Sequence, residues 1–160
     1  MADLVVYCAG YTVAMPFLDP EVLDPSADNR VRLYQRVFHP VVPGLSVVGL
    51  VRPLGAVMPL AEEQGRLVAD QLTGVYALPD AETMRAEMDG YEAWLGKRFV
   101  KSTRHTLEVD FDDYLRQLKR ERRRGAKRAD ALRDGGADQG VIARKSKTQK
   151  ALLGVRKLLP

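Results

Sequence analysis

The chain has few of the residues that crosslink a fold or bind metal ions. Its single cysteine, Cys8, excludes an internal disulfide, which indicates a reducing compartment and predicts a cytoplasmic location. One cysteine and two histidines cannot supply the usual ligand set of a zinc site, so no metal is expected. No apolar run approaches the roughly 18 residues of a membrane span, and the first residues show no basic, signal-like region.

Motifs that would identify a self-contained catalytic site are also missing. The sequence contains no G-x-S-x-G nucleophile elbow, no phosphate-binding P-loop and no G-x-G-x-x-G dinucleotide fingerprint. His105 has Ser102 and Glu108 as near neighbours, but nearness in sequence does not make a triad, so a hydrolase based on His105 has little support. His39, in a connector before Pro40, is interpreted as structural or solvated. The residues alone predict a soluble but incomplete α/β domain.

Charge is divided unevenly along the chain. Residues 119–160 carry 14 Lys and Arg against 4 Asp and Glu, whereas the net charge of the whole chain is only +4. We therefore predict an acidic folded part over 1–118 and a basic, flexible tail over 119–160, whose end has the pattern of a short amphipathic helix. The tail lacks aromatic residues for base stacking, so no nucleic acid partner is expected. A solubilising tail is the simpler interpretation, and peripheral contact with an anionic membrane is the alternative.

The stretch 45–74 predicts a strand, a tight turn and a helix. The apolar run 45–51 suits a strand buried on both faces, and Pro and Gly in 52–55 break it. After Pro59 the apolar residues take helical spacing, and Gly74 is a suitable helix end. This unit directs the helix N-terminus and its N–H groups at whatever lies beyond the strand. The same pattern fits an ordinary βα unit of a buried sheet, and pattern alone does not separate the two.

The flanking segments predict further elements. Residues 4–9 form a buried-type strand that requires neighbouring strands, and residues 31–38 predict a second strand that pairs with 45–51 as a hairpin. Asp80 is expected to cap a helix with an apolar stripe, residues 107–111 alternate as a short extended segment, and an amphipathic helix begins near Tyr114.

Several segments resemble flavin-containing monooxygenases. Asp3–Leu18, which reads DLVVYCAGYTVAMPFL, is similar to the family pattern D-x-V-x-x-A/C-T-G-Y-x-x-x-F-P-F-L. Five further matches follow in the family's order: L-Y-x-x-V-F-x-P at 33–40, V-G-L-x-x-P-L-G at 48–55, E-Q-x-R at 63–66, L-P with Met84 at 78–84, and R-H-T-x-x-V-D at 104–110. Each match is short, but their order over roughly 115 residues is specific. The resemblance ends near residue 120.

The resemblance implies the C-terminal portion of an enzyme built on two Rossmann-like dinucleotide-binding domains, an α/β fold with an incomplete sheet plus helices. Such enzymes use FAD and NADPH. NADPH reduces the flavin, oxygen adds to give a C4a-hydroperoxyflavin, and that species oxygenates a soft nitrogen or sulfur centre or, in related enzymes, a ketone. The implied partners are a nucleophilic small molecule and the missing N-terminal part that binds FAD and NADPH.

The resemblance also implies where the cofactors bind. Gly10 and Tyr11 would lie where the chain crosses from the NADPH domain to the FAD domain, and the helix that starts near Pro59 would stabilise negative charge on the reduced flavin ring. No catalytic residue is identified. The implied cofactor-binding residues are Gly10, Tyr11, Arg52, Pro53, Leu54, Gly55 and Gln64.

This sequence departs from the family pattern in two places. Ala9 stands where the family usually has threonine, so a hydroxyl contact is lost. Both glycine-rich phosphate-binding fingerprints are absent, and we therefore expect the isolated chain to bind FAD weakly or not at all and to be inactive. The alternative hypothesis is a non-catalytic remnant that binds a partner, an anionic membrane or nucleic acid through its basic tail.

Overall fold

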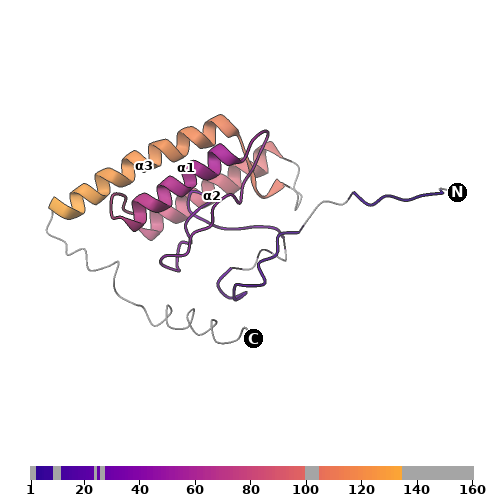
Figure 1. Ribbon diagram of the computed structural model, residues 1–160, viewed down its shortest axis with the longest axis horizontal. Coiled ribbons are helices and arrows are strands. Elements are labelled where there is room, and N and C mark those ends of the chain that lie inside the picture. Colours follow the sequence, from indigo (N-terminus) through magenta and orange to yellow (C-terminus); the bar gives the residue numbers. More distant parts are fainter. Residues whose placement is uncertain (1–2, 9–11, 24, 26–27, 100–104, 135–160) are drawn as a thin grey trace.

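The computed structural model describes residues 3–8, 12–23, 25, 28–99 and 105–134 (Figure 1). In these residues three helices form the body, and α1 and α3 lie side by side with α2 below them in the view of Figure 1. The element order is β1 (Arg52–Pro53), α1 (Met58–Leu72), α2 (Ala81–Arg98), β2 (Glu108–Val109) and α3 (Phe111–Asp134).

The two short strands place the starts of α1 and α3 at one edge. β1 and β2 pair in parallel, with Arg52 opposite Glu108 and Pro53 opposite Val109. Each strand is followed by a helix, and α1 contacts α3 first through Gln64 and Tyr114 and further along through Asp70 and Arg122, as expected when two parallel strands lead into neighbouring helices. The α/β class is thus present as a fragment of three helices and a two-stranded sheet.

The helix ends lie where the local sequence predicts them. Pro59 occupies the first turn of α1, and Gly74 follows that helix with φ of +75°, a backbone conformation that favours glycine. The Asp80 carboxylate caps α2 by accepting a hydrogen bond from the Thr83 N–H at 2.8 Å. Both helix starts and the end of α1 were therefore predicted correctly from capping residues and glycine.

The predicted strands are wrong for most of their length. In 45–51 only Ser46 takes part in a β-bridge, because Gly49 has φ of +82° and turns the chain out of an extended path. Residues 4–8 form no strand, and Leu4–Tyr7 are 63–89% exposed, since no neighbouring strand lies beside them in the described chain. In the predicted extended segment 107–111 only Glu108–Val109 is strand, and α3 begins at Phe111.

Residues 31–38 form a tight turn in place of the second predicted strand. Gln35 and Arg36 have φ of +53° and +56°, and Tyr34 bridges to Phe38 across them. The expected hairpin with 45–51 is reduced to a single antiparallel bridge from Phe38 to Ser46. A strand cannot continue through two residues in the left-handed conformation, and for this reason the strand predicted from the apolar pattern of 31–38 is not formed.

Helix α3 continues well past residue 118, where the folded part was expected to end. It runs to Asp134, and its buried positions keep helical spacing along the whole length: Tyr114, Leu118, Glu121, Gly125 and Ala129. The prediction of a flexible tail is therefore wrong for 119–134. The rest of the predicted tail, including its amphipathic pattern, lies outside the described residues.

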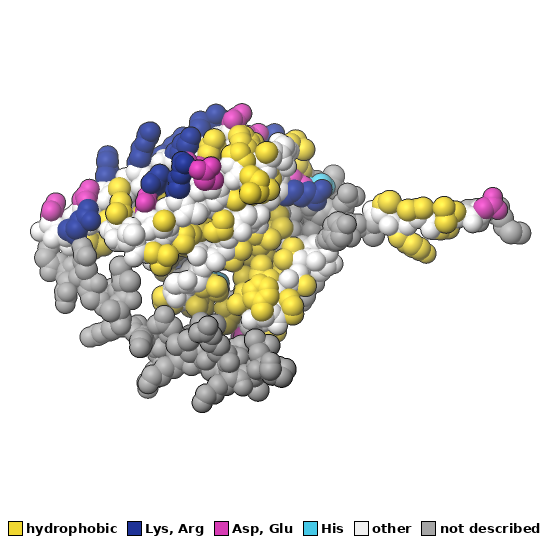
Figure 2. Space-filling view, in the orientation of Figure 1, with side chains coloured by type: hydrophobic (Ala, Val, Ile, Leu, Met, Phe, Trp, Pro, Cys, Tyr) yellow, Lys and Arg dark blue, Asp and Glu magenta, His cyan; other side chains and the backbone are white. Residues whose placement is uncertain are grey.

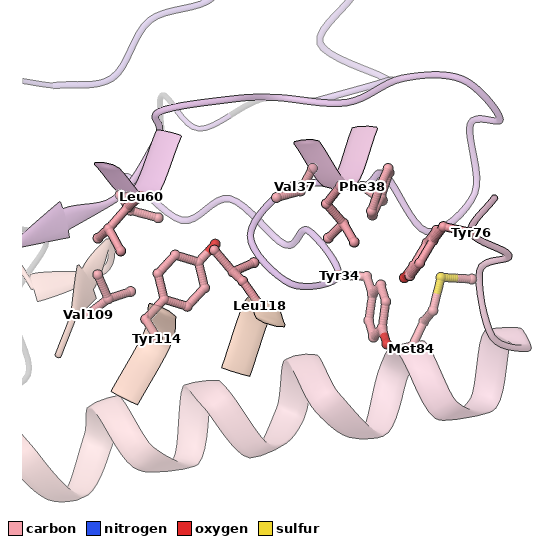
Figure 3. Packing of buried hydrophobic residues seen from close by; sticks show 11 residues of the cluster. Tyr34, Val37, Phe38, Leu60, Tyr76, Met84, Val109, Tyr114 and Leu118 are labelled. Carbon is pink, nitrogen blue, oxygen red and sulfur yellow. The ribbon is translucent and has the colours of Figure 1, made fainter. Parts of the chain in front are cut away.

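The core lies between the turn and the three helices (Figure 3). Leu60 and Leu67 of α1, together with Leu118 of α3, are at most 1% exposed. Tyr76 stacks on Phe38 with 5.8 Å between the ring centroids. The remaining members of this cluster are Tyr34, Val37, Val51, Met84, Val109 and Tyr114.

Candidate functional site

The segment with implied cofactor contacts is the loop 49–57, which includes β1 and leads into α1. Leu54 is 93% exposed and Met58, the first residue of α1, is 73% exposed. Between them Gly55 has φ of +117°, and a Cβ added there would meet no atom within 4 Å. We call Arg52–Met58 the apolar loop. Its apolar side chains Leu54 and Met58 are exposed to solvent, and the backbone at Gly55 is not covered by other atoms.

The start of α1 adds an electrostatic element to this loop. Val57 is the N-cap residue and makes no capping hydrogen bond through its side chain, while Pro59 carries no N–H. The positive end of the helix dipole therefore lies beside Leu54 and Gly55, without a side-chain cap from the described residues. A planar group with developing negative charge is the kind of ligand that this end of a helix stabilises.

Arg52 joins the loop to β2. Its backbone N–H donates to the Leu107 carbonyl at 2.7 Å, and its Nε lies 3.4 Å from the Glu108 Oε1. Glu108 is almost buried and also lies 3.3 Å from the His105 Nδ1. The Arg52 side chain remains half-exposed at the rim of the loop, and Pro53 is half-buried next to it.

Gln64 lies beneath the loop and is fully buried. Its Oε1 accepts from the Gly49 N–H at 2.7 Å, and its Nε2 donates to the Tyr114 hydroxyl at 2.7 Å. That hydroxyl donates in turn to the Gln35 carbonyl at 2.7 Å. Burial raises the pKa of Tyr114, so the hydroxyl keeps its proton and remains a donor. Gln64 thus fixes the base of the loop to α3 and to the tight turn.

A second buried cluster surrounds Arg36, which the sequence analysis missed. The Arg36 guanidinium lies between two aromatic rings, 4.4 Å from the Tyr91 centroid and 4.9 Å from the Tyr114 centroid. Its Nη2 bonds to the Glu87 Oε1 at 2.5 Å, and the Glu87 Oε2 accepts from the Gln35 N–H at 3.1 Å. These contacts hold the left-handed turn. Arg36, Glu87, Tyr91 and Tyr114 also line a cavity of about 290 Å³ between α2 and α3.

The sequence contains no local pattern that would have identified this cluster. Gln35 and Arg36 are two of the three variable positions of the matched pattern L-Y-x-x-V-F-x-P, so the family pattern itself does not identify them. Only the pairing with Glu87 and Tyr91 of α2, more than 50 residues away, reveals their role. Such long-range pairing cannot be read from local spacing.

The described residues contain no recognisable hydrolytic or metal site. His105 stacks on Phe99 and lies near Glu108, while Ser102 lies outside the described residues. No group of three or more His, Cys, Asp or Glu side chains could hold a metal ion in the described part of the chain. No helix of that part is long and apolar enough to cross a membrane.

The structure brings together four of the predicted cofactor residues. Arg52, Pro53, Leu54 and Gly55 lie on the apolar loop, and Gln64 supports it from below. Gly10 and Tyr11 lie outside the described residues. A left-handed glycine, an exposed leucine and the start of a helix are suited to one edge of a flavin ring, whereas the sequence has no G-x-G-x-x-G fingerprint to hold its diphosphate.

Comparison with known proteins shows the family to which the chain is similar. Residues 1–127 match the FMO-like family, described as flavin-binding monooxygenase-like. Over 118 residues the chain is 38% identical to flavin-containing monooxygenase 5 of Rattus norvegicus and 37% identical to that of Homo sapiens, covering 72% of this chain and 22% of each relative. The structure of S-allyl-L-cysteine S-oxygenase from Allium sativum matches with a TM-score of 0.59 and 27% identity, covering 94% of this chain and 36% of that one.

The chain spans about a fifth of the length of these curated relatives. The matched segment contains β1, the apolar loop, α1, α2 and most of α3, so the elements that position the candidate site are those that the family model covers. With a match over most of its length, the chain belongs to the flavin-binding monooxygenase-like family.

Proposed function

We propose that this chain is the C-terminal part of an FAD- and NADPH-dependent monooxygenase that oxygenates soft nitrogen or sulfur centres. The observation that carries this proposal is the family match over residues 1–127. The names of two relatives support the substrate class: an S-oxygenase from Allium sativum, and an N-oxide-forming dimethylaniline monooxygenase of Rattus norvegicus that is 35% identical over 118 residues.

In this proposal the apolar loop contacts the flavin ring. When bound, FAD supplies the redox chemistry that the side chains of this chain lack. Leu54 and Met58 exclude water from the ring edge, Gly55 allows close backbone approach, and the start of α1 stabilises negative charge on the ring. Gln64 does not contact the flavin itself in this proposal, because it lies beneath the loop and holds it through the Gly49 N–H.

The isolated chain is proposed to be inactive. Its sequence has no glycine fingerprint at which a helix N-terminus could hold the diphosphate of either cofactor. Leu54, Met58 and the segment 4–7 are also more exposed than apolar residues of a finished domain surface would be. We therefore propose that a further polypeptide part, resembling the N-terminal portion of the relatives, supplies the fingerprints and covers these residues.

The first test is a titration of the chain alone with FAD, in which binding is measured by fluorescence and by calorimetry. We expect weak binding or none. A tight, stoichiometric complex would contradict the claim that the missing glycines are required.

The second test places the segment in a complete enzyme. In rat flavin-containing monooxygenase 5, the aligned 118 residues are replaced by those of this chain, and bound FAD and NADPH-dependent oxidation of a sulfide are measured. We expect flavin binding in the chimera and its loss in Gly55→Val. Gly44→Val is the matched control, because Gly44 also has positive φ and open space but lies away from the loop. Equal loss of flavin in both variants would refute the assigned contact.

A further inference from the structure

The outward side of α3 carries a compact group of basic residues. Five cations within three helical turns are all exposed: Lys119, Arg120, Arg123, Arg124 and Lys127. We call these five residues the basic stripe. At about 1.5 Å per residue the stripe is about 12 Å long. Figure 2 shows Lys and Arg side chains gathered along the upper edge of the molecule, over α3.

The stripe is distinct from the basic residues that stabilise the fold. Arg122 pairs with Asp70 of α1, and Arg128 pairs with Glu121 beside Tyr76, so both turn inward. Within the described residues the structure records no carboxylate partner for any member of the stripe. Five neighbouring cations repel one another, which is a cost that a partner of opposite charge removes.

We propose that the basic stripe docks the protein on an anionic phospholipid surface. A bilayer is flat, and the stripe lies on the outward side of the helix, so all five cations can approach one plane without movement of the body. Residues 1–118 carry 17 Asp and Glu against 11 Lys and Arg. The acidic body is therefore repelled from the same surface, and this asymmetry orients α3 toward it.

Lipid is favoured over nucleic acid by the residue types involved. The stripe contains only Lys and Arg, with no aromatic side chain for stacking on a base. The sequence after α3 adds six Lys and Arg in 144–157 together with Leu152, Leu153, Val155, Leu158 and Leu159. Apolar residues among cations contribute to binding at a lipid interface but not along a phosphate backbone.

The test is cosedimentation of the full chain with vesicles of phosphatidylserine mixed with phosphatidylcholine, compared with vesicles of phosphatidylcholine alone. We expect binding only to the anionic vesicles, and its loss near 1 M salt, where the screening length falls to about 3 Å. Each cation at such a surface changes affinity about fivefold, so Arg123→Gln with Arg124→Gln should weaken binding about 25-fold.

The matched control removes two other exposed cations, Arg85→Gln with Lys97→Gln on α2. This pair changes the net charge equally and should alter vesicle affinity less than about twofold. Circular dichroism establishes that both double variants remain folded. Equal weakening by the two pairs, unchanged binding after loss of Arg123 and Arg124, no binding to anionic vesicles, or tighter binding to a random DNA duplex at the same salt would each overturn the proposal.

Discussion

Gly125 decides whether α3 is part of the folded body, and its replacement by alanine tests this directly. A Cβ built on Gly125 would lie 1.8 Å and 2.0 Å from two ring carbons of Tyr76, far inside van der Waals contact. Tyr76 cannot turn away easily, because it is 3% exposed and stacks on Phe38, and its hydroxyl donates to Glu121 at 3.1 Å. Arg128 lies over the same ring. The new methyl group must therefore displace the ring or the helix.

Two opposing terms set the size of the effect. Alanine is about 1 kcal/mol more favourable than glycine inside a helix. Overpacking a fixed core position costs about 1–3 kcal/mol, and more where an aromatic ring loses its place. Because the Tyr76 ring is held on several sides, we expect a cost at the upper end of this range, so that Gly125→Ala lowers the free energy of unfolding by about 2 kcal/mol net, measured by urea denaturation of the chain.

Glycines elsewhere in the helices supply the control. A Cβ on Gly65 of α1 or Gly90 of α2 would meet nothing within 4 Å, so Gly65→Ala and Gly90→Ala should each stabilise by about 0.5–1 kcal/mol. In a Tyr76→Ala background, Gly125→Ala should also become stabilising, because the clash is gone. If Gly125→Ala stabilises the otherwise unchanged chain as the controls do, α3 does not pack on Tyr76 and the reasoning fails.

Three further predictions concern buried or capping residues. Arg36→Ala should destabilise by about 3 kcal/mol, because it removes a buried cation from between two aromatic rings and leaves the mostly buried Glu87 without its ion-pair partner. Arg32→Ala, which breaks an exposed pair, should change the free energy of unfolding by at most about 1 kcal/mol. Gln64→Leu should cost about 1–3 kcal/mol in urea denaturation, since the Gly49 N–H loses its acceptor and the buried Tyr114 hydroxyl loses one of its two hydrogen bonds. The backbone N–H of the first turn of α2 lowers the pKa of Asp80, so its stabilising contribution is present at neutral pH and lost as pH falls through that lowered value. Asp80→Asn should remove this acid-dependent loss of helicity, whereas an unchanged pH profile would contradict the cap.

Local signals predicted α1 and α2 well because a helix is defined by contacts within the same segment. Pro59, Gly74 and Asp80 each act within a turn of their own position, and each lies where the sequence indicated. The predictions of strands were wrong for the opposite reason, since a strand is stable only when a partner strand lies beside it. Residues 4–8 have the composition of a strand but no neighbour among the described residues, and 45–51 is interrupted by the left-handed Gly49.

The sequence predicted too early an end for α3, because the inward-facing positions of its second half do not have the composition of a core. Beyond Leu118 the buried residues are Glu121, Gly125 and Ala129, which carry little apolar side chain. Glu121 is tolerated there because Arg128 and Tyr76 satisfy it, and Gly125 is needed where the Tyr76 ring approaches the helix. A glycine that signals interruption in a sequence can therefore mark the closest packing of a helix.

The apolar loop was located by family resemblance, but the contacts that hold it in position are known only from the structure. A continuous path of hydrogen bonds runs from the Gly49 N–H through Gln64 and the Tyr114 hydroxyl to the Gln35 carbonyl. It ties the loop to α3 and to the left-handed turn that Arg36 stabilises. Because these groups are buried, breaking one link leaves polar atoms without partners, and the penalty opposes movement of the loop. The family pattern includes the first two members of this path, Gly49 and Gln64, while its other end, Gln35, and the neighbouring Arg36 are positions that the pattern leaves open. The candidate flavin edge is thus preorganised by residues that need not touch the flavin.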